Sequence, residues 1–369
     1  MFRQRGLDAD LNQKTAGSDS KKGETDLGDA YLLGHRKGKT RPAILLGLGI
    51  SCLLLWSALF WTRESPGPVR WQKVAVLSGH HSPIQTVVFS PDGLRLASGD
   101  HEGRLLIWDW QTRQQLADFR ADDEPILSLA FSPDGKTLVT GSMAGAVKIW
   151  DMTRAKEIRT LPSHSSGVVA VSFSPDGSQL ATATATGVVT LWHPFTGKQH
   201  ASWKTTHKLD ITCMAFAPDG HILATGSLDR SVRLWDPATG LEQGALEQPS
   251  GGIYALAFAR GRNSLATAGA DGTIKIWDLD DHQANQTLEA TDTLLLGLAA
   301  SADGRKLVAG SMDGSVYLWD LDARQEPITL CQGRKGQWLK AVAFAPNGDR
   351  LAFGTNANYS LEGWELSTH

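Results

Sequence analysis

Histidine is the residue type in this chain that most invites a chemical interpretation. His80, His164 and His207 each stand at the same offset before a hydrophobic segment. A histidine can act as a general acid or base or bind a metal, but either role needs partners at a suitable spacing. His80 and His81 have no carboxylate or thiol at ligand spacing, so we expect no metal site there.

Other signatures of catalysis or metal binding are incomplete. The acidic run Asp278-Leu279-Asp280-Asp281 lacks the glycine and the distal glutamate of a calcium-binding loop. The three cysteines, Cys52, Cys213 and Cys331, form neither a disulfide pattern nor a zinc motif. No nucleophile elbow or phosphate-binding loop occurs in the sequence. We therefore expect no catalytic residue, no metal and no cofactor.

A repeated unit supplies the elements that must position these residues. Its clearest copy runs from Thr206 to Trp235 and reads as three short strands joined by two tight turns. A tryptophan ends the third strand of every unit and recurs at intervals of 42–45 residues: Trp108, Trp150, Trp192, Trp235, Trp277, Trp319 and Trp364. A period in this range indicates a repeat architecture.

The unit resembles the Trp-Asp (WD) repeat of the β-propeller family. Five units have aspartate after the tryptophan, and the other two read Trp192-His193 and Trp364-Glu365. The resemblance covers roughly residues 71–366. It implies a scaffold for binding, in a family that hosts many unrelated roles.

Counting strands predicts how the ring closes. Fourth, outer strands follow the tryptophan in six units: Gln114–Phe119, Glu157–Leu161, Gln199–Trp203, Leu241–Leu246, Ala284–Leu288 and Pro327–Cys331. Only five residues follow Trp364, too few for such a strand, whereas Trp71–Leu77 has no earlier strand to pair with. Pairing the two ends would remove an exposed edge. We predict an all-β fold, one closed seven-bladed β-propeller over residues 71–369.

The resemblance also implies a structural role for the repeated histidines. In the WD-repeat family this histidine bonds a Ser or Thr on the second strand, an Asp in the next turn and the tryptophan. The matching positions are His207, Thr225, Asp229 and Trp235 in unit four, and His80, Ser98, Glu102 and Trp108 in unit one. A buried polar network of this kind stabilises a fold only when every member is satisfied.

Three segments precede the propeller. Residues 1–42 are polar, which predicts a disordered tail. Residues 43–62 hold 19 uncharged residues, Ala43 to Trp61, which as a helix would span roughly 28 Å of the ~30 Å bilayer core. Residues 63–70 form a Pro/Gly spacer. We predict a transmembrane helix at 43–62; a cleaved signal peptide and a buried core helix are the alternatives.

Basic residues on the two sides of this segment predict its orientation. Four precede it and two follow it: Arg36, Lys37, Lys39 and Arg41, then Arg63 and Arg70. The positive-inside rule then gives a single-pass protein with a cytoplasmic N-terminus and an extracytoplasmic propeller. The formal net charge of −3 does not suit a nucleic-acid-binding protein, so we expect no nucleic-acid partner.

One face of the predicted propeller carries the candidate contact residues. The turn between strands two and three and the loop before strand one both open there, with His101, Met143, Leu228, Met312 and Trp338. Exposed apolar points and tryptophan anchors favour partner contact. We expect a membrane-anchored, non-catalytic scaffold that docks a protein or peptide. A cell-surface propeller enzyme or a glycan-binding module is the alternative, and acidic residues at the channel mouth would favour it.

Overall fold

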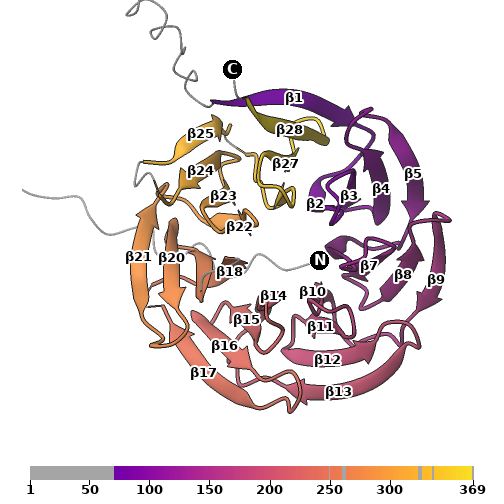
Figure 1. Cartoon of the computed structure of the whole chain (residues 1–369), viewed down its shortest axis with the longest axis vertical. Helices are drawn as coiled ribbons and strands as arrows, with labels where there is room; N and C mark the ends of the chain where they lie inside the picture. Colours follow the sequence, from indigo (N-terminus) through magenta and orange to yellow (C-terminus); the bar gives the residue numbers. More distant parts are fainter. Residues whose placement is uncertain (1–69, 249, 260–262, 323–325, 335, 368–369) are drawn as a thin grey trace, which may run out of the picture. The chain divides into compact units, whose positions relative to one another are not determined.

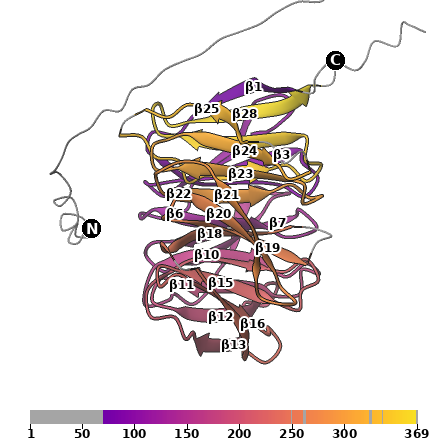
Figure 2. The same ribbon diagram turned by 90° about the vertical axis from the view of Figure 1, so that its left-hand side faces the viewer.

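The computed structural model describes residues 70–248, 250–259, 263–322, 326–334 and 336–367. These residues form seven four-stranded sheets, set as blades around a channel (Figure 1) and seen from the edge in Figure 2. The predicted all-β, seven-bladed propeller is confirmed. The predicted tail, membrane helix and spacer lie outside the described residues, except for Arg70. Within the described part, no helix is long and apolar enough to cross a membrane.

Each blade runs outward from the channel through four antiparallel strands. The innermost strands are β2 (Ile84–Phe89), β6 (Ile126–Phe131), β10 (Val168–Phe173), β14 (Ile211–Phe216), β18 (Ile253–Ala259), β22 (Leu295–Ala300) and β26 (Val342–Phe344). The second strands are β3 (Arg95–Asp100), β7 (Thr137–Ser142), β11 (Leu180–Thr184), β15 (Leu223–Ser227), β19 (Ser264–Gly269), β23 (Lys306–Ser311) and β27 (Arg350–Thr355).

The outer half of each blade contains the repeated tryptophan. The third strands are β4 (Arg104–Asp109), β8 (Val147–Asp151), β12 (Val188–His193), β16 (Ser231–Trp235), β20 (Thr273–Asp278), β24 (Val316–Asp320) and β28 (Ser360–Ser367). The outer strands are β5 (Gln115–Arg120), β9 (Lys156–Thr160), β13 (Lys198–Lys204), β17 (Glu242–Glu247), β21 (Ala284–Glu289), β25 (Ile328–Cys331) and, for the last blade, β1 (Arg70–Ser78). Every outer strand lies within one residue of its predicted bounds.

Tight turns connect the first and second strands of the blades. In the second blade, Ser132 Oγ donates to Asp134 Oδ1 at 2.6 Å and accepts the backbone N–H of Thr137 at 3.0 Å. Gly135 supplies the positive φ of 68° that the turn requires. These side-chain hydrogen bonds take the place of the backbone bonds between strands where the chain reverses. They hold each turn at the same end of its blade.

A bulge at one position of the innermost strand shapes the channel. In six blades the pairing with the second strand skips one residue: Gln85, Leu127, Val169, Thr212, Tyr254 and Leu296. A bulge leaves its extra residue out of the ladder and re-aims its side chain. All six residues line a cavity in the channel, so the bulges build a ring of unlike side chains there.

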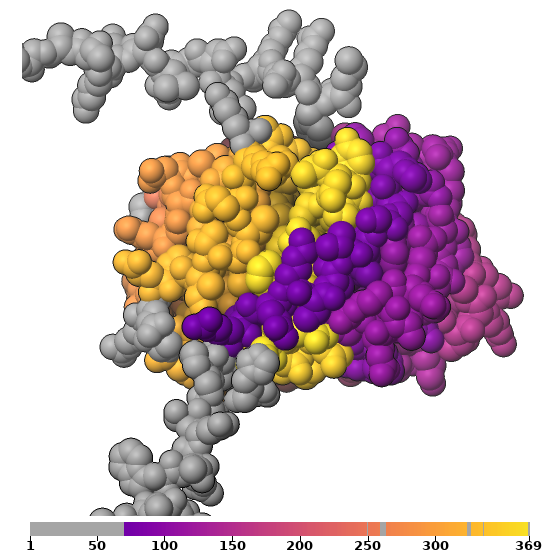
Figure 3. Space-filling model, turned by 90° about the horizontal axis from the view of Figure 1, so that it is seen from above, coloured from indigo at the N-terminus to yellow at the C-terminus, as the bar shows by residue number. Residues whose placement is uncertain are grey.

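The two ends of the described chain meet in the seventh blade. β1 pairs antiparallel with β28, from Arg70 opposite Ser367 to Ser78 opposite Ser360. Figure 3 shows β1, in indigo, lying along the yellow residues of the last blade. Leu77 is buried in a hydrophobic cluster shared by the seventh and first blades. The predicted ring closure by Trp71–Leu77 is therefore confirmed, and it joins the two ends of the repeat array.

Candidate docking face and polar networks

The residues proposed from the sequence as contacts come from equivalent turns. In six blades the residue after the second strand donates its backbone N–H to the residue just before the innermost strand. The pairs include His101 to Pro83, Met143 to Pro125, Leu228 to Asp210 and Met312 to Leu294, at 2.8–3.1 Å. In the seventh blade, Asn356 donates its side-chain amide to the carbonyl of Trp338. The structure thus brings the five candidate residues to one end of the blades, around the channel.

These five side chains differ in how much surface they offer. Met312 is 49% exposed. His101 is also exposed, whereas Met143, Leu228 and Trp338 are half-buried against their loops. The apolar contact points are therefore spaced around the channel mouth, in blades two, four, six and seven, and they do not form one continuous patch.

A cavity of about 190 Å³ at the channel mouth is lined by the innermost strands, and the five candidate residues are not part of its described lining. Its lining is mostly small, apolar or hydroxyl-bearing, and its uncharged polar members are Gln85, Thr86, Ser128, Thr212 and Tyr254. Lys340 is the one charged side chain among the described residues that line it. The opposite end of the channel is different, because a cavity of about 540 Å³ there is lined by Phe and Pro side chains from the turns and strand ends.

Lys340 is an amine in a setting that disfavours its charge. It is half-buried, just before β26, and burial lowers its pKa. Cys213 lies near it, and burial raises the pKa of that thiol to about 11, so the thiol stays neutral. None of the described residues that line the cavity carries a carboxylate. An acidic group that enters the mouth would therefore be the one carboxylate near this amine and would favour its charged form.

The histidine network of the fourth blade joins residues from two strands and from two of the segments that connect strands. Trp235 Nε1 donates to Thr225 Oγ1 at 2.9 Å, and that hydroxyl lies 2.9 Å from His207 Nε2. His207 Nδ1 is 3.1 Å from Asp229 Oδ2. Since the threonine has one proton to donate, Nε2 is its acceptor and the Nδ1–H donates to Asp229.

The electrostatics of this network suit a neutral histidine and a charged aspartate. Burial lowers the pKa of His207, although Asp229 opposes the shift. Burial disfavours the charge of Asp229, but hydrogen bonds from Ser231 and from the backbone of Lys208 outweigh it and lower its pKa to about 2. The ring and the carboxylate are 0% and 6% exposed, so the pair is placed to stabilise the blade and not to meet a substrate.

The first blade builds the same network with a different carboxylate. His80 Nε2 lies 2.6 Å from Ser98 Oγ, and Ser98 Oγ accepts a hydrogen bond from Trp108 Nε1 at 3.0 Å. His80 Nδ1 is 2.7 Å from Asp100, not from Glu102, so the assignment of Glu102 from the sequence is wrong. Asp100 ends β3 and also accepts the backbone N–H groups of Glu102 and Arg104, which pulls its carboxylate inward.

The other blades keep parts of the network. In the third blade Trp192 donates to Thr182 at 2.9 Å, and Thr182 lies 3.1 Å from His164, whose pKa is lowered by burial. The seventh blade has Phe353 at the position of the hydroxyl, and it stacks on Trp364 with ring centroids 6.3 Å apart. The network is therefore replaceable by apolar packing, as expected of a structural device.

Among the described residues, no group of three or more His, Cys, Asp or Glu side chains is arranged to hold a metal ion. Lys340 is not among the residues expected from the sequence, although aligning the units places it in the column of bulge residues. Pro194, two residues after the tryptophan of the third blade, is not among them either, and it borders a groove described below.

The closed ring of four-stranded blades, with a tryptophan on each third strand, defines a WD-type β-propeller. Comparison with protein-family models matches residues 83–364 to the IFT122 first beta-propeller family, and the chain belongs to this family. The matched region covers more than half of the chain. No curated protein matches the sequence. A propeller of this kind is compatible with a protein-interaction scaffold.

Proposed function

We propose that this protein is a membrane-anchored, non-catalytic scaffold whose propeller docks a protein or peptide partner at the channel mouth. The observation that carries the proposal is the mouth itself. Half-buried and exposed apolar side chains, among them Met312 and Trp338, lie at the end of the blades where the loops before the innermost strands are. The described lining of the channel cavity includes the amine of Lys340, and an incoming carboxylate would stabilise its charged form. Apolar anchors combined with such an amine suit an acidic, partly apolar segment.

The docking residues are tested by comparing captured partners between variants. We expect Met312→Asp and Trp338→Ala to remove the same partner protein from material cross-linked to the full-length chain in its host cells. Lys340→Met is expected to weaken the same capture, because it keeps the length of the side chain and removes the charge. Leu116→Asp is the control, since Leu116 is 51% exposed on the outer strand β5. Capture that is unchanged in all three mouth variants would exclude this face as the docking site.

The membrane anchor is residues 43–62, and the supporting observations are the uncharged run and its flanking basic residues. In this proposal the N-terminus is cytoplasmic and the propeller lies outside the membrane on the far side. We expect an external protease to release or digest the propeller in intact cells, with lysed cells as the control. Protection until lysis would instead indicate a cytoplasmic scaffold tethered to the inner membrane surface.

The alternative, a cell-surface propeller enzyme or glycan-binding module, would need polar groups grouped at a cleft. Glycan hydrolysis in particular uses paired carboxylates. The described lining of the channel mouth supplies hydroxyl groups, one amide and one amine in a mainly apolar wall. This chemistry favours docking of a polypeptide over recognition of a glycan.

A further inference from the structure

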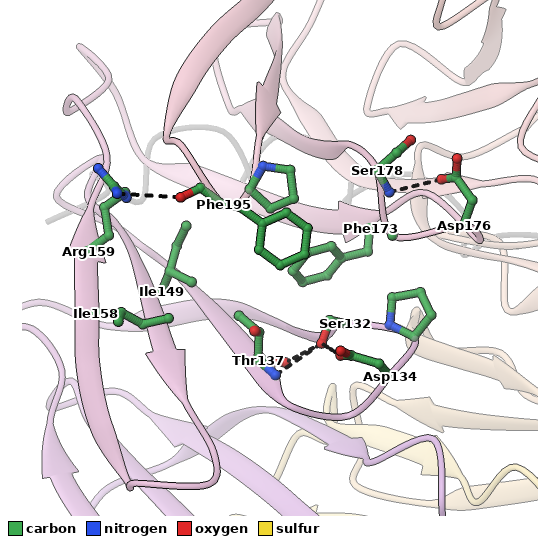
Figure 4. Close-up of a pocket in the computed structure, with 13 residues that line it drawn as sticks. Ser132, Asp134, Thr137, Ile149, Ile158, Arg159, Phe173, Asp176, Ser178 and Phe195 are labelled. Carbon is green, nitrogen blue, oxygen red and sulfur yellow. Dashed lines mark hydrogen bonds between the residues drawn. The ribbon is translucent and has the colours of Figure 1, made fainter.

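A groove lies between the second and third blades, at the end of the strands opposite the docking face. It encloses about 640 Å³ and is formed by the turn Ser132–Thr137, strand β9 and the turn after β12. Figure 4 shows Ile149, Ile158 and Arg159 on one side, Phe173 and Phe195 in the middle, and Asp134 and Asp176 toward the other side.

Large apolar side chains are left open to water at this groove. Phe195 is 72% exposed and Ile158 is 52% exposed, while Phe173 forms a nearly buried floor. Arg159 Nη2 donates to the carbonyl of Phe195 at 3.4 Å, so the guanidinium lies beside the loop that contains Phe195. Exposed apolar residues that border a preformed cavity mark a binding site more often than scattered ones do.

The neighbouring blades show what normally fills this space. The residue after the Trp-Asp pair is Trp110 in the first blade and Met152 in the second, and both are buried. Trp110 packs on Phe89 and donates to Glu365 of the preceding blade. Met152 packs in the cluster shared with the first blade. At this position a long side chain therefore closes the gap between a blade and its predecessor.

The third blade has Pro194 at this position, and its short ring leaves the gap open. Proline also lacks the N–H that the equivalent residues use, such as Met152, which donates to the carbonyl of Lys136 at 2.8 Å. The carbonyl in the corresponding place belongs to Ser178, which lines the groove and receives no such bond from Pro194. Pro194 thus accounts both for the open volume of the groove and for the Ser178 carbonyl that accepts no backbone bond from this position.

The charged groups at the groove indicate which charge a ligand should carry. Hydrogen bonds from Ser132 and from the backbone of Lys136 lower the pKa of Asp134. Bonds from Ser174 and Ser178 lower that of Asp176 to about 2. Both carboxylates are therefore ionised at neutral pH at one end of an apolar cavity. Arg159 also lines the groove, but it lies with Ile149 and Ile158 on the side away from the two carboxylates (Figure 4). A cationic group of the ligand at the carboxylate end would therefore meet two negative charges beside an apolar surface.

We propose that the groove between blades two and three binds an extended peptide segment in which a large apolar residue is followed by a lysine or arginine. The apolar side chain lies among Ile158, Phe173 and Phe195, and the basic side chain reaches Asp134 and Asp176. A backbone N–H of the peptide takes the place of the missing donor at Ser178. This site is separate from the channel mouth, so its occupancy does not depend on the docking face.

The test uses a random linear peptide library displayed on phage, selected on the immobilised full-length protein. We expect the enriched peptides to share an apolar residue followed by a basic one. Pro194→Met should weaken the affinity for a selected peptide by at least about 10-fold, which corresponds to losing the burial of one large apolar side chain. Methionine occupies the same position in the second blade and restores a backbone donor, so the variant is expected to fold.

Leu116→Met is the control, because Leu116 is 51% exposed on the outer strand β5 of the first blade and does not line the groove. It should leave binding unchanged. Asp134→Asn and Asp176→Asn should each weaken binding by about 2- to 5-fold and reduce its dependence on salt. No enrichment over uncoated beads, enrichment of acidic peptides, or equal binding to Pro194→Met and the unmodified protein would each overturn the proposal.

Discussion

Replacing Leu77 by alanine is expected to lower the free energy of unfolding of the propeller by about 2–5 kcal/mol. Leu77 is 3% exposed and packs in a cluster that joins the last blade to the first. Its neighbour on the same strand, Val76, is 50% exposed and points away from that cluster. Val76→Ala should therefore change stability by no more than about 0.5 kcal/mol.

The large effect follows from the position of β1 in the ring. β1 is the outer strand of the seventh blade, and the chain runs on from it into the innermost strand of the first blade. Weakening it exposes the edge of β28 and loosens the contact that holds both ends of the array. Denaturant unfolding followed by tryptophan fluorescence measures the change. Equal midpoints for Leu77→Ala and Val76→Ala would show that the ring does not depend on this closure.

Much of this fold could be predicted because its signals are local and repeated. The tryptophan period and the Pro-Asp-Gly turns fix where each strand begins, independently of any long-range contact. The closure by β1 was also predictable, since one strand at each end lacked a partner. A count of strands is enough to predict it, because closing the ring pairs both unpaired edges at once.

The details of the sites were less predictable because they depend on packing between blades. Lys340 occupies the position that is bulged in the other six blades, and its environment exists only once seven strands converge. Pro194 looks like an ordinary turn residue in its own unit. Its effect lies in the packing of the third blade against the second, where the proline leaves a gap. Met152 fills the equivalent gap between the second blade and the first.

The carboxylate that bonds His80 in the first blade was also hard to predict, because two acidic residues lie only two positions apart. Unit alignment places Glu102 where the fourth blade has Asp229, and it was assigned to His80 for that reason. In the structure, Asp100 reaches His80 from the last position of β3, while Glu102 contributes its backbone N–H to Asp100. A hydrogen-bond network selects the carboxylate that can also satisfy nearby backbone donors, and alignment does not contain that information.

Asp100→Ala is expected to destabilise the protein by about 3–5 kcal/mol, the range for removing one partner of a buried pair. The side chains of His80 and Asp100 are both 0% exposed. Without Asp100, the ring Nδ1–H and the backbone N–H groups of Glu102 and Arg104 lose their acceptor. Glu102→Ala is the control, because its exposed side chain can be removed while its backbone bond to Asp100 remains.

The pH dependence separates this network from simple packing. Burial disfavours the charge of Asp100, but the bond from His80 and the backbone donors outweigh it, so its pKa lies below the model-peptide value of 3.8. A carboxylate with a depressed folded-state pKa contributes stability above its unfolded pKa and loses it as the pH falls through the folded value. The difference in unfolding free energy between the unmodified protein and Asp100→Ala should therefore be constant near neutrality and shrink below about pH 3.8. A difference that persists unchanged in acid, or a Glu102→Ala variant as unstable as Asp100→Ala, would mean that the ionised Asp100 is not what holds His80.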